Sequence, residues 1–184
     1  MAAVNSKNWY IDAKRFIEEI FGNDADLFTA LLVATSPQVT VQINWNLACK
    51  IYQQFKTGQE PDLISCMRNH KANVKRVLAG ELLQGNKVKA FYANLRGDLS
   101  EVTIDGWMLK LFGWADRHTS VTPSNNQYRK LARAFRSVAK NNGYEPAEFQ
   151  AILWVKFRTQ NGYEPVSILS VGADKRQYTF EDLY

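Results

Sequence analysis

Apolar residues recur every three or four positions along most of the chain, which is the spacing that places them on one face of an α-helix. Glycine, asparagine and proline interrupt the pattern and mark the helix ends. The pattern predicts helices over residues 6–21, about 24–35 and 38–55, one or two helices within 61–85, and helices that begin near 86 and 105. A basic helix over 127–140 and a last helix over 145–159 follow. We therefore expect an all-α protein with seven to nine helices.

The last part of the chain lacks this spacing. Residues 167–184 contain the runs I-L-S-V and R-Q-Y-T-F, which are rich in residues that favour strands. We expect a short strand or hairpin there, packed on the helices.

Length and composition indicate one folded domain. The 184 residues are 46% hydrophobic, 12% aromatic and 22% charged, which is ordinary for a globular protein. We expect a single domain over 1–184, in which 6–114 form one part and the basic helix, last helix and tail over 122–184 form the other. No run approaches the ~18 apolar residues that a membrane helix needs, and the first residues lack an apolar signal core. We expect no membrane association and a cytoplasmic location.

Charge and cysteine content narrow the classes of partner. The formal net charge is +5, which permits a polyanionic partner such as DNA. Cys49 and Cys66 are the two cysteines and His70 and His118 the two histidines, and their spacing fits no zinc or iron–sulfur motif. No phosphate-loop or dinucleotide motif occurs either. We expect no metal and no cofactor.

One aspartate stands at a predicted helix start. In V-T-I-D-G-W-M-L-K-L-F-G-W (102–114), Asp105 follows a short β-branched approach and precedes an apolar helical run. Aspartate is among the best helix N-caps, so capping is the simpler interpretation. A catalytic carboxylate is the alternative.

Two further segments carry positive charge. In L-Q-G-N-K-V-K-A-F-Y-A-N-L (83–95), a turn at Gly85 and Asn86 leads into a helix, and Lys87 and Lys89 lie near its start. A helix start of this kind presents backbone N–H groups to a phosphate, although a solvated helix end explains it as well. In the basic helix, four of the five cations recur every three or four residues and form a basic stripe, which consists of Arg129, Arg133, Arg136 and Lys140. We place this stripe opposite Leu131, Ala134, Phe135 and Val138. The cations of this helix are Arg129, Lys130, Arg133, Arg136 and Lys140.

A polar turn separates two apolar helices near residue 36. Thr35, Ser36 and Gln38 supply several hydrogen-bonding groups there. Helix capping explains them adequately, and exposure to a ligand is the alternative.

Taken in order, these segments resemble the helix-hairpin-helix DNA glycosylase superfamily, the all-helical group that includes the endonuclease III and adenine glycosylase types. L-L-V-A-T-S-P-Q-V-T-V resembles its first helix pair, L-Q-G-N-K-V-K-A-F its hairpin, and I-D-G-W-M-L-K-L-F-G the segment with its catalytic aspartate. The resemblance covers about residues 27–114. K-V-K-A-F-Y-A-N-L, V-T-I-D-G-W and Q-A-I-L-W-V-K-F-R also resemble a group of short bacteriophage proteins, which would place the protein in the cytoplasm of a bacterial host.

The resemblance implies roles for particular residues. Asp105 falls on the catalytic position, and Lys89 on the lysine that bifunctional members use as a nucleophile. Phe91, Tyr92 and Trp107 would line the pocket for the base that is turned out of the duplex. Phosphates would be held by the basic stripe and by Gly85, Asn86 and Lys87, and the turn of Thr35, Ser36 and Gln38 would meet the duplex. The chain departs from the family pattern at Lys87 (second hairpin glycine), Thr35 (glutamine) and Trp107 (histidine), and it lacks the iron–sulfur cysteines.

Three functions are compatible with these features. The first is a DNA-binding enzyme that acts on a flipped base or modified nucleotide through the N-glycosidic bond. The second is a non-catalytic phage protein that keeps the fold to bind DNA or a host protein, for example against host defence. The third is an enzyme that builds hypermodified DNA bases.

Overall fold

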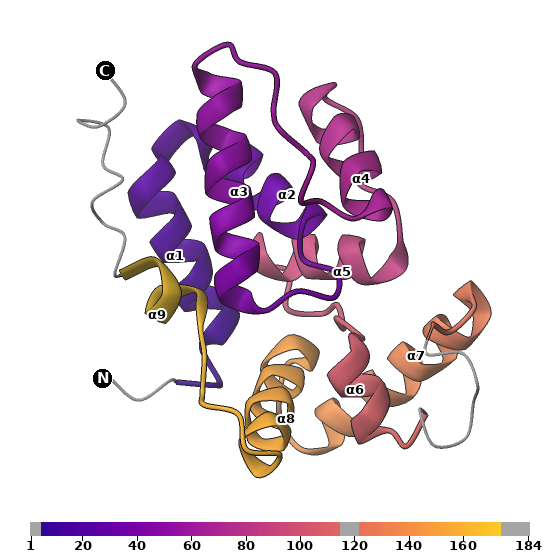
Figure 1. Ribbon diagram of the computed structural model, residues 1–184. Helices are drawn as coiled ribbons and strands as arrows, with labels where there is room; N and C mark the ends of the chain where they lie inside the picture. The colour runs from indigo at the N-terminus through magenta and orange to yellow at the C-terminus, as the bar shows by residue number, and fades with distance from the viewer. Residues whose placement is uncertain (1–4, 115–121, 174–184) are drawn as a thin grey trace. The chain divides into compact units, whose positions relative to one another are not determined.

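The computed structural model describes residues 5–114 and 122–173. All regular structure within these residues is helical, and Figure 1 shows its course. The elements are α1 (Trp9–Phe21), the 3-10 helix η1 (Gly22–Asp24), α2 (Ala25–Ala34), α3 (Val41–Lys56), α4 (Arg68–Leu78), α5 (Asn86–Leu95), α6 (Gly106–Leu111), α7 (Asn125–Asn141), α8 (Pro146–Gln160) and α9 (Ile168–Ala173). The predicted all-α class is confirmed.

The chain forms two compact units, each assembled from separate stretches. Unit 1 contains Met1–Ile11 and Gly85–Pro165, and unit 2 contains Asp12–Gln84 and Val166–Tyr184. Unit 1 therefore holds α5 to α8 and the first turn of α1. Unit 2 holds the rest of α1 with α2, α3, α4 and α9.

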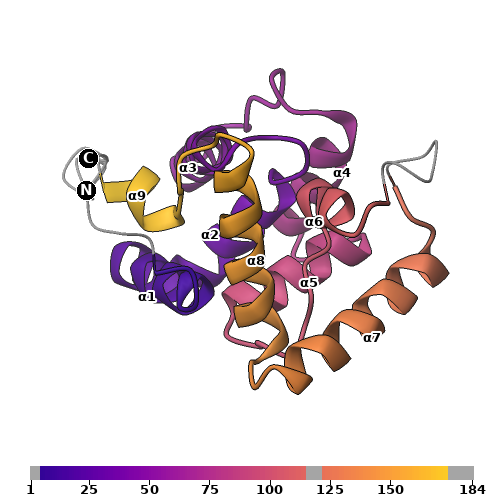
Figure 2. The same ribbon diagram turned by 90° about the horizontal axis from the view of Figure 1, so that it is seen from below.

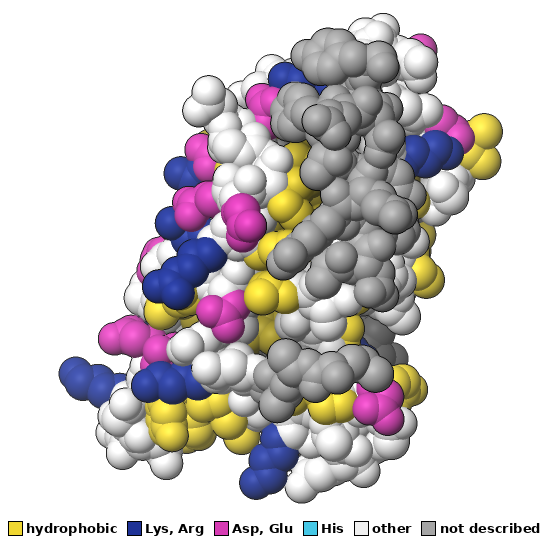
Figure 3. Space-filling model, turned by 90° about the vertical axis from the view of Figure 1, so that its left-hand side faces the viewer, with side chains coloured by type: hydrophobic (Ala, Val, Ile, Leu, Met, Phe, Trp, Pro, Cys, Tyr) yellow, Lys and Arg dark blue, Asp and Glu magenta, His cyan; other side chains and the backbone are white. Residues whose placement is uncertain are grey.

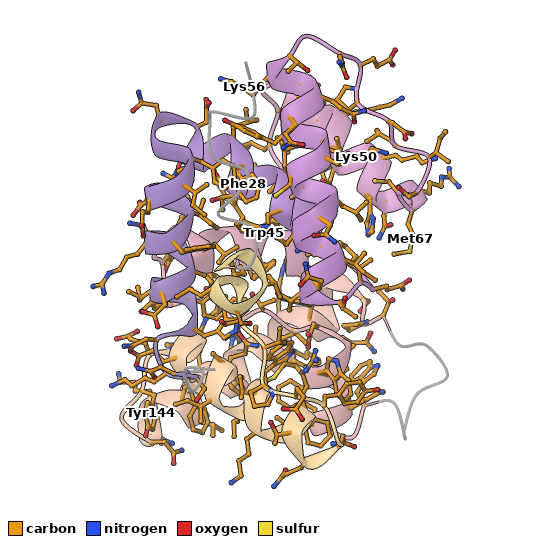
Figure 4. All side chains as sticks on the ribbon, turned by 60° about the vertical axis from the view of Figure 1, so that its left-hand side comes forward. Phe28, Trp45, Lys50, Lys56, Met67 and Tyr144 are labelled. Atoms are coloured by element: carbon orange, nitrogen blue, oxygen red, sulfur yellow. The ribbon has the colours of Figure 1, made fainter. Side chains whose placement is uncertain are left out.

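Unit 2 is built around α2, which packs between α3 and α4 (Figure 1). Seven of its ten residues are buried, as expected for a helix that is apolar on most sides. The rings of Phe28 and Trp45, labelled in Figure 4, lie 5.0 Å apart between α2 and α3, and Phe21 stacks on Phe28 at 3.6 Å. These aromatic contacts form the centre of the unit 2 core.

Local contacts set helix starts that differ from the predicted ones. Asp24 stands at the N-cap position of α2 but makes no capping hydrogen bond. Its carboxylate instead accepts a hydrogen bond from Tyr52 (2.8 Å) and pairs with Lys56 (2.7 Å), which lowers its pKa. α3 begins at Val41 and not at 38, because the Thr40 side chain accepts a hydrogen bond from the backbone N–H of Ile43 (3.2 Å).

The predicted C-terminal strand is wrong for residues 168–173, which form α9. Ile168 and Val171 are buried, and Gly172 lies so close to Phe16 and Trp45 that a side chain has no room there. The rest of the predicted hairpin, including R-Q-Y-T-F, lies outside the described residues.

Unit 1 has its own core between α6, α7 and the segment before α6, and both α6 and α7 also pack against α8. Figure 2 shows the tight turn through which α7 leads into α8. Ser124 and Gln127 form a capping box at the start of α7, and Pro146 opens α8. The core residues are Val102, Ile104, Met108, Leu109, Tyr128, Ala132, Phe135 and Ala139.

The buried face of α7 differs in part from the predicted one. Phe135 is buried as expected, but Val138 is 49% exposed and Ala134 is exposed. The face is completed by Tyr128, Ala132 and Ala139, so the basic stripe borders the buried side instead of lying opposite it.

Surface charge elsewhere is mixed. Lysine, arginine and acidic side chains alternate on the face shown in Figure 3, and Lys14 pairs with Glu18 along α1 at 2.9 Å. Among the described helices, none has the length and apolar character to cross a membrane.

Candidate functional site around Asp105

Asp105 is the N-cap of α6, so the capping prediction is confirmed. Its Oδ1 accepts a hydrogen bond from the backbone N–H of Met108 (2.9 Å). Its Oδ2 accepts a second from the indole N–H of Trp154 in α8 (2.8 Å). The two bonds fix the position of both carboxylate oxygens, while the residue stays half-buried.

The segment before Asp105 is held rigidly. Val102, Thr103 and Ile104 lie outside any helix and are almost fully buried. The Tyr128 hydroxyl donates to the carbonyl of Val102 (2.9 Å) and accepts from the N–H of Ile104 (3.1 Å). Burial raises the pKa of Tyr128 to about 12, so the hydroxyl stays protonated at neutral pH. α7, the helix that carries the basic stripe, thus anchors the segment that leads to Asp105.

Two cations interact electrostatically with Asp105. Burial lowers the pKa of Lys87 to about 8, and the Asp105 carboxylate acts in the opposite direction. Burial also lowers the pKa of Arg158, again opposed by Asp105. Functional sites often contain a lysine of lowered pKa that interacts electrostatically with a carboxylate.

Lys87 and Lys89 differ in their surroundings. Lys89, on which the family's nucleophile falls, is exposed, whereas Lys87 is half-buried and interacts electrostatically with Asp105. The lysines are two residues apart on a helix and so project about 200° apart. The amine with the properties of a nucleophile is therefore that of Lys87, which we had expected to hold phosphate.

The turn before α5 lies beside the start of α7. Gly85 has φ +103°, a conformation that other residues rarely adopt, and no side chain caps the helix that follows. The Asn86 amide donates to Oδ1 of Asn125 at the start of α7 (2.9 Å). The two predicted phosphate-binding elements thus begin next to each other.

The basic stripe of α7 has one member that is already paired. Arg136 binds Glu101 (2.6 Å) and donates from Nε to the carbonyl of Ser100 (2.9 Å). The three other members and the neighbouring Lys130 are exposed, and their side chains make no ion pair or hydrogen bond with the residues that the structure describes. They are Arg129, Lys130, Arg133 and Lys140.

The three predicted pocket aromatics do not share one cluster. Phe91 contacts Trp9 and Tyr10 at ring separations of 6.3 and 6.2 Å. Trp107 contacts Tyr163 (4.9 Å) and Phe157 (6.2 Å), whereas Tyr92 lies near Arg96. Trp154 contacts Trp9 at 6.2 Å and also binds Asp105.

Sequence reasoning missed Trp154 and Arg158. They stand four residues apart on α8, and the Arg158 guanidinium lies 4.5 Å from the Trp154 ring. Their helical spacing is visible in the sequence, but their link to Asp105 spans 49 positions and has no sequence signal.

The polar turn at 35–38 belongs to unit 2. Thr35 is fully buried, and its hydroxyl bonds to the carbonyl of Leu31 (3.0 Å) and to Asn44 (2.7 Å), so it has no surface to offer to DNA. Ser36 is half-buried and donates to the carbonyl of Val33 (2.9 Å). Gln38 is exposed and has φ +60°, which is uncommon outside glycine.

Comparison with known proteins gives one family. The model of a family of unknown function, DUF7178, matches residues 2–161, which is most of the chain and includes every element of the site around Asp105 except part of the segment after α8. No curated protein and no solved structure matches the chain. Among the described residues, no group of three or more histidine, cysteine or acidic side chains is arranged to hold a metal ion.

Proposed function

The chain belongs to the DUF7178 family, and we propose that it binds DNA and acts at Asp105 on the N-glycosidic bond of a nucleotide turned out of the duplex. The observation that carries this proposal is the pair of Asp105 and Lys87. A carboxylate with both oxygens positioned interacts there with a lysine whose pKa is about 8. The order of the glycosylase-like segments in the sequence also supports the proposal.

The chemistry follows from charge. Breaking an N-glycosidic bond builds positive charge on the sugar, and a carboxylate held near that carbon stabilises it. The lowered pKa of Lys87 increases the share of its side chain that is an uncharged amine near neutral pH. Such an amine can attack the C1′ carbon of the sugar as the base leaves with the electron pair of the C–N bond. Loss of the amine protons, one of them to the departing base, and opening of the C1′–O4′ bond to a hydroxyl then give a Schiff base.

DNA binding is supported by the elements around this pair. The exposed cations of α7 lie on the helix whose start is joined to the start of α5 by the Asn86–Asn125 hydrogen bond. Cations in a row bind the phosphate backbone without reading its sequence. Extruding a nucleotide costs a few kcal/mol, which these contacts would offset.

A specific observation also favours a second candidate, a DNA-binding protein without catalysis. Both oxygens of Asp105 accept hydrogen bonds from within the protein, from Met108 and from Trp154. A carboxylate used in this way has a complete structural role as a cap and as an anchor for α8.

The Asp105→Asn variant separates the two candidates, because asparagine keeps an acceptor for the capping bond while it removes the charge and the acceptor for the Trp154 N–H. Purified protein is incubated with duplexes that carry uracil, oxidised, alkylated or phage-type modified bases, and released base is measured. We expect release by the wild type and a loss of at least about 100-fold in the variant, since one charge-stabilising group contributes that much.

Asp98→Asn is the matched control, because Asp98 also accepts a backbone hydrogen bond in unit 1, from Ser100 (3.0 Å). Release must persist in this control. Salt-sensitive binding to DNA with no release from any substrate would support the non-catalytic candidate. Absence of DNA binding would contradict both.

A further inference from the structure

Arg158 is surrounded by aromatic rings. Its guanidinium lies 4.5 Å from the centre of the Trp154 ring, 5.3 Å from Tyr163 and 5.5 Å from Trp107. Aromatic faces attract cations, and three rings hold this flat group in one place. The residue as a whole is half-buried, so part of the side chain or backbone remains accessible.

A second cation shares one of these rings. The Lys110 ammonium lies 4.7 Å from the centre of the Trp107 ring, and the Lys110 side chain is exposed. Two positive groups held at one indole repel each other, and an anion near both would offset this repulsion. Asp105 acts on Arg158, but its oxygens already accept hydrogen bonds from Met108 and Trp154.

The hydrogen-bonding capacity of Arg158 is also incomplete. Its Nε is buried and has no hydrogen-bond partner within the part of the chain that the structure describes. Buried donors nearly always have an acceptor, so an arginine in this state is suited to an acceptor from a ligand. Arginine pairs with phosphate through two parallel N–H groups, and the surrounding rings fix its plane for this geometry.

We propose that Arg158 and Lys110, held by Trp107, Trp154 and Tyr163, bind a phosphate group of a nucleic-acid strand next to Asp105. This inference rests on the DNA binding proposed above and adds a phosphate site apart from the α7 stripe. The indole of Trp154 bonds to Asp105 and contacts the Arg158 guanidinium, so one ring separates the phosphate site from the carboxylate. Tyr163 is 50% exposed, which leaves aromatic surface on which a neighbouring base stacks.

The test compares Arg158→Gln with Lys156→Gln. Lys156 is exposed and lies two residues earlier on α8, about 200° around the helix, so its variant removes the same charge from the other side. Binding of a fluorescein-labelled oligonucleotide duplex is measured by anisotropy at several salt concentrations. Loss of one phosphate contact makes the slope of log K against log salt shallower by about 0.9, or roughly five- to tenfold weaker binding at ~0.1 M salt.

We expect this change for Arg158→Gln and not for Lys156→Gln. Lys110→Gln, which alters an exposed side chain, must show a change in the same direction, so the test remains decisive if Arg158→Gln fails to fold. Equal slopes for the wild type, Arg158→Gln and Lys110→Gln would overturn the inference and leave the DNA-binding proposal standing. A wild type that binds no DNA would overturn both. Competition by a nucleoside monophosphate that Arg158→Gln abolishes, with DNA binding unchanged, would overturn the assignment to a strand and favour a free nucleotide.

Discussion

At the scale of single residues, Asp105 combines a structural and an electrostatic role. The capping bond from Met108 and the bond from Trp154 hold its carboxylate at the end of a buried segment. A charge held in this way needs no rearrangement to act on a ligand. Asparagine, which removes the charge and the bond from Trp154 but keeps the cap, is therefore more informative than alanine, which would also cost about 1 kcal/mol of stability through the lost cap.

Lys87 provides a prediction about pH. Because burial lowers its pKa to about 8, the amine should react with an acylating reagent with a midpoint near pH 8, which mass spectrometry of the labelled peptides measures. In Asp105→Asn the midpoint should fall further, because the carboxylate that favours the charged amine is gone. A midpoint near the ordinary lysine value of about 10.4 would contradict the prediction.

The same pKa fixes a direction for stability. The pKa of Lys87 is lower in the folded protein than in the unfolded chain. Below the folded pKa the buried lysine is charged, which disfavours folding. Between the two pKa values the unfolded chain binds more protons than the folded protein, so stability increases with pH there. The free energy of unfolding should therefore increase as pH rises from about 8 toward 10.5, and Lys87→Met should remove this increase. The comparison uses denaturant melts of both proteins across that range.

At the scale of the elements, the sequence predicts best the helices with strong end signals. In the structure Ser124 caps α7 and Pro146 opens α8, and both helices lie within about two residues of the predicted ranges. Within 61–85, only Arg68–Leu78 is helical. The Asn73 amide binds the backbone N–H (2.8 Å) and carbonyl (3.1 Å) of Gln84, and this holds the following residues as a loop.

The error at α9 has a similar cause. The run I-L-S-V has the apolar content of a short strand or of a helical turn, and its period alone does not distinguish them. The contact of Gly172 with Phe16 and Trp45, which lie more than 120 positions away in the sequence, favours the helix. The site divides in the same way: the cap at Asp105 is local and was predicted, but Arg158 and Trp154 join it through tertiary packing.

Helix α7 gives a prediction that separates DNA contact from folding. Arg133→Gln removes an exposed cation and should make the salt slope of DNA binding shallower by about 0.9, with little change in stability. Arg136→Gln breaks the bonds to Glu101 and Ser100 and should lower the free energy of unfolding by about 0.5–1 kcal/mol, with a smaller effect on DNA. Anisotropy titrations and thermal melts measure the two quantities. The opposite ranking would show that α7 is not the phosphate-binding face.

At the scale of the whole molecule, the chain passes between the two units three times. Residues up to Ile11 belong to unit 1, where the Tyr10 hydroxyl donates to Gln150 in α8 (2.5 Å). The chain then forms unit 2, returns to unit 1 at Gly85 and re-enters unit 2 at Val166. Each unit thus depends on segments from distant parts of the sequence, and the site around Asp105 needs residues from the first turn of α1 to α8.

Gly172 tests this dependence for unit 2, because it brings the last described helix against residues near the start of the chain. An added β-carbon would lie 2.7 Å from Cζ of Phe16 and 3.1 Å from the Trp45 ring, closer than atoms pack. Gly172→Ala should therefore lower the free energy of unfolding by about 1–3 kcal/mol, measured by denaturant melts followed through tryptophan fluorescence. Gly106→Ala is the control, since its β-carbon meets open space and alanine favours a helix over glycine. Equal stability of the two variants would mean that α9 does not hold unit 2 together. A loss confined to Gly172→Ala would show that the packing of α9 against Phe16 and Trp45 contributes to the stability of unit 2.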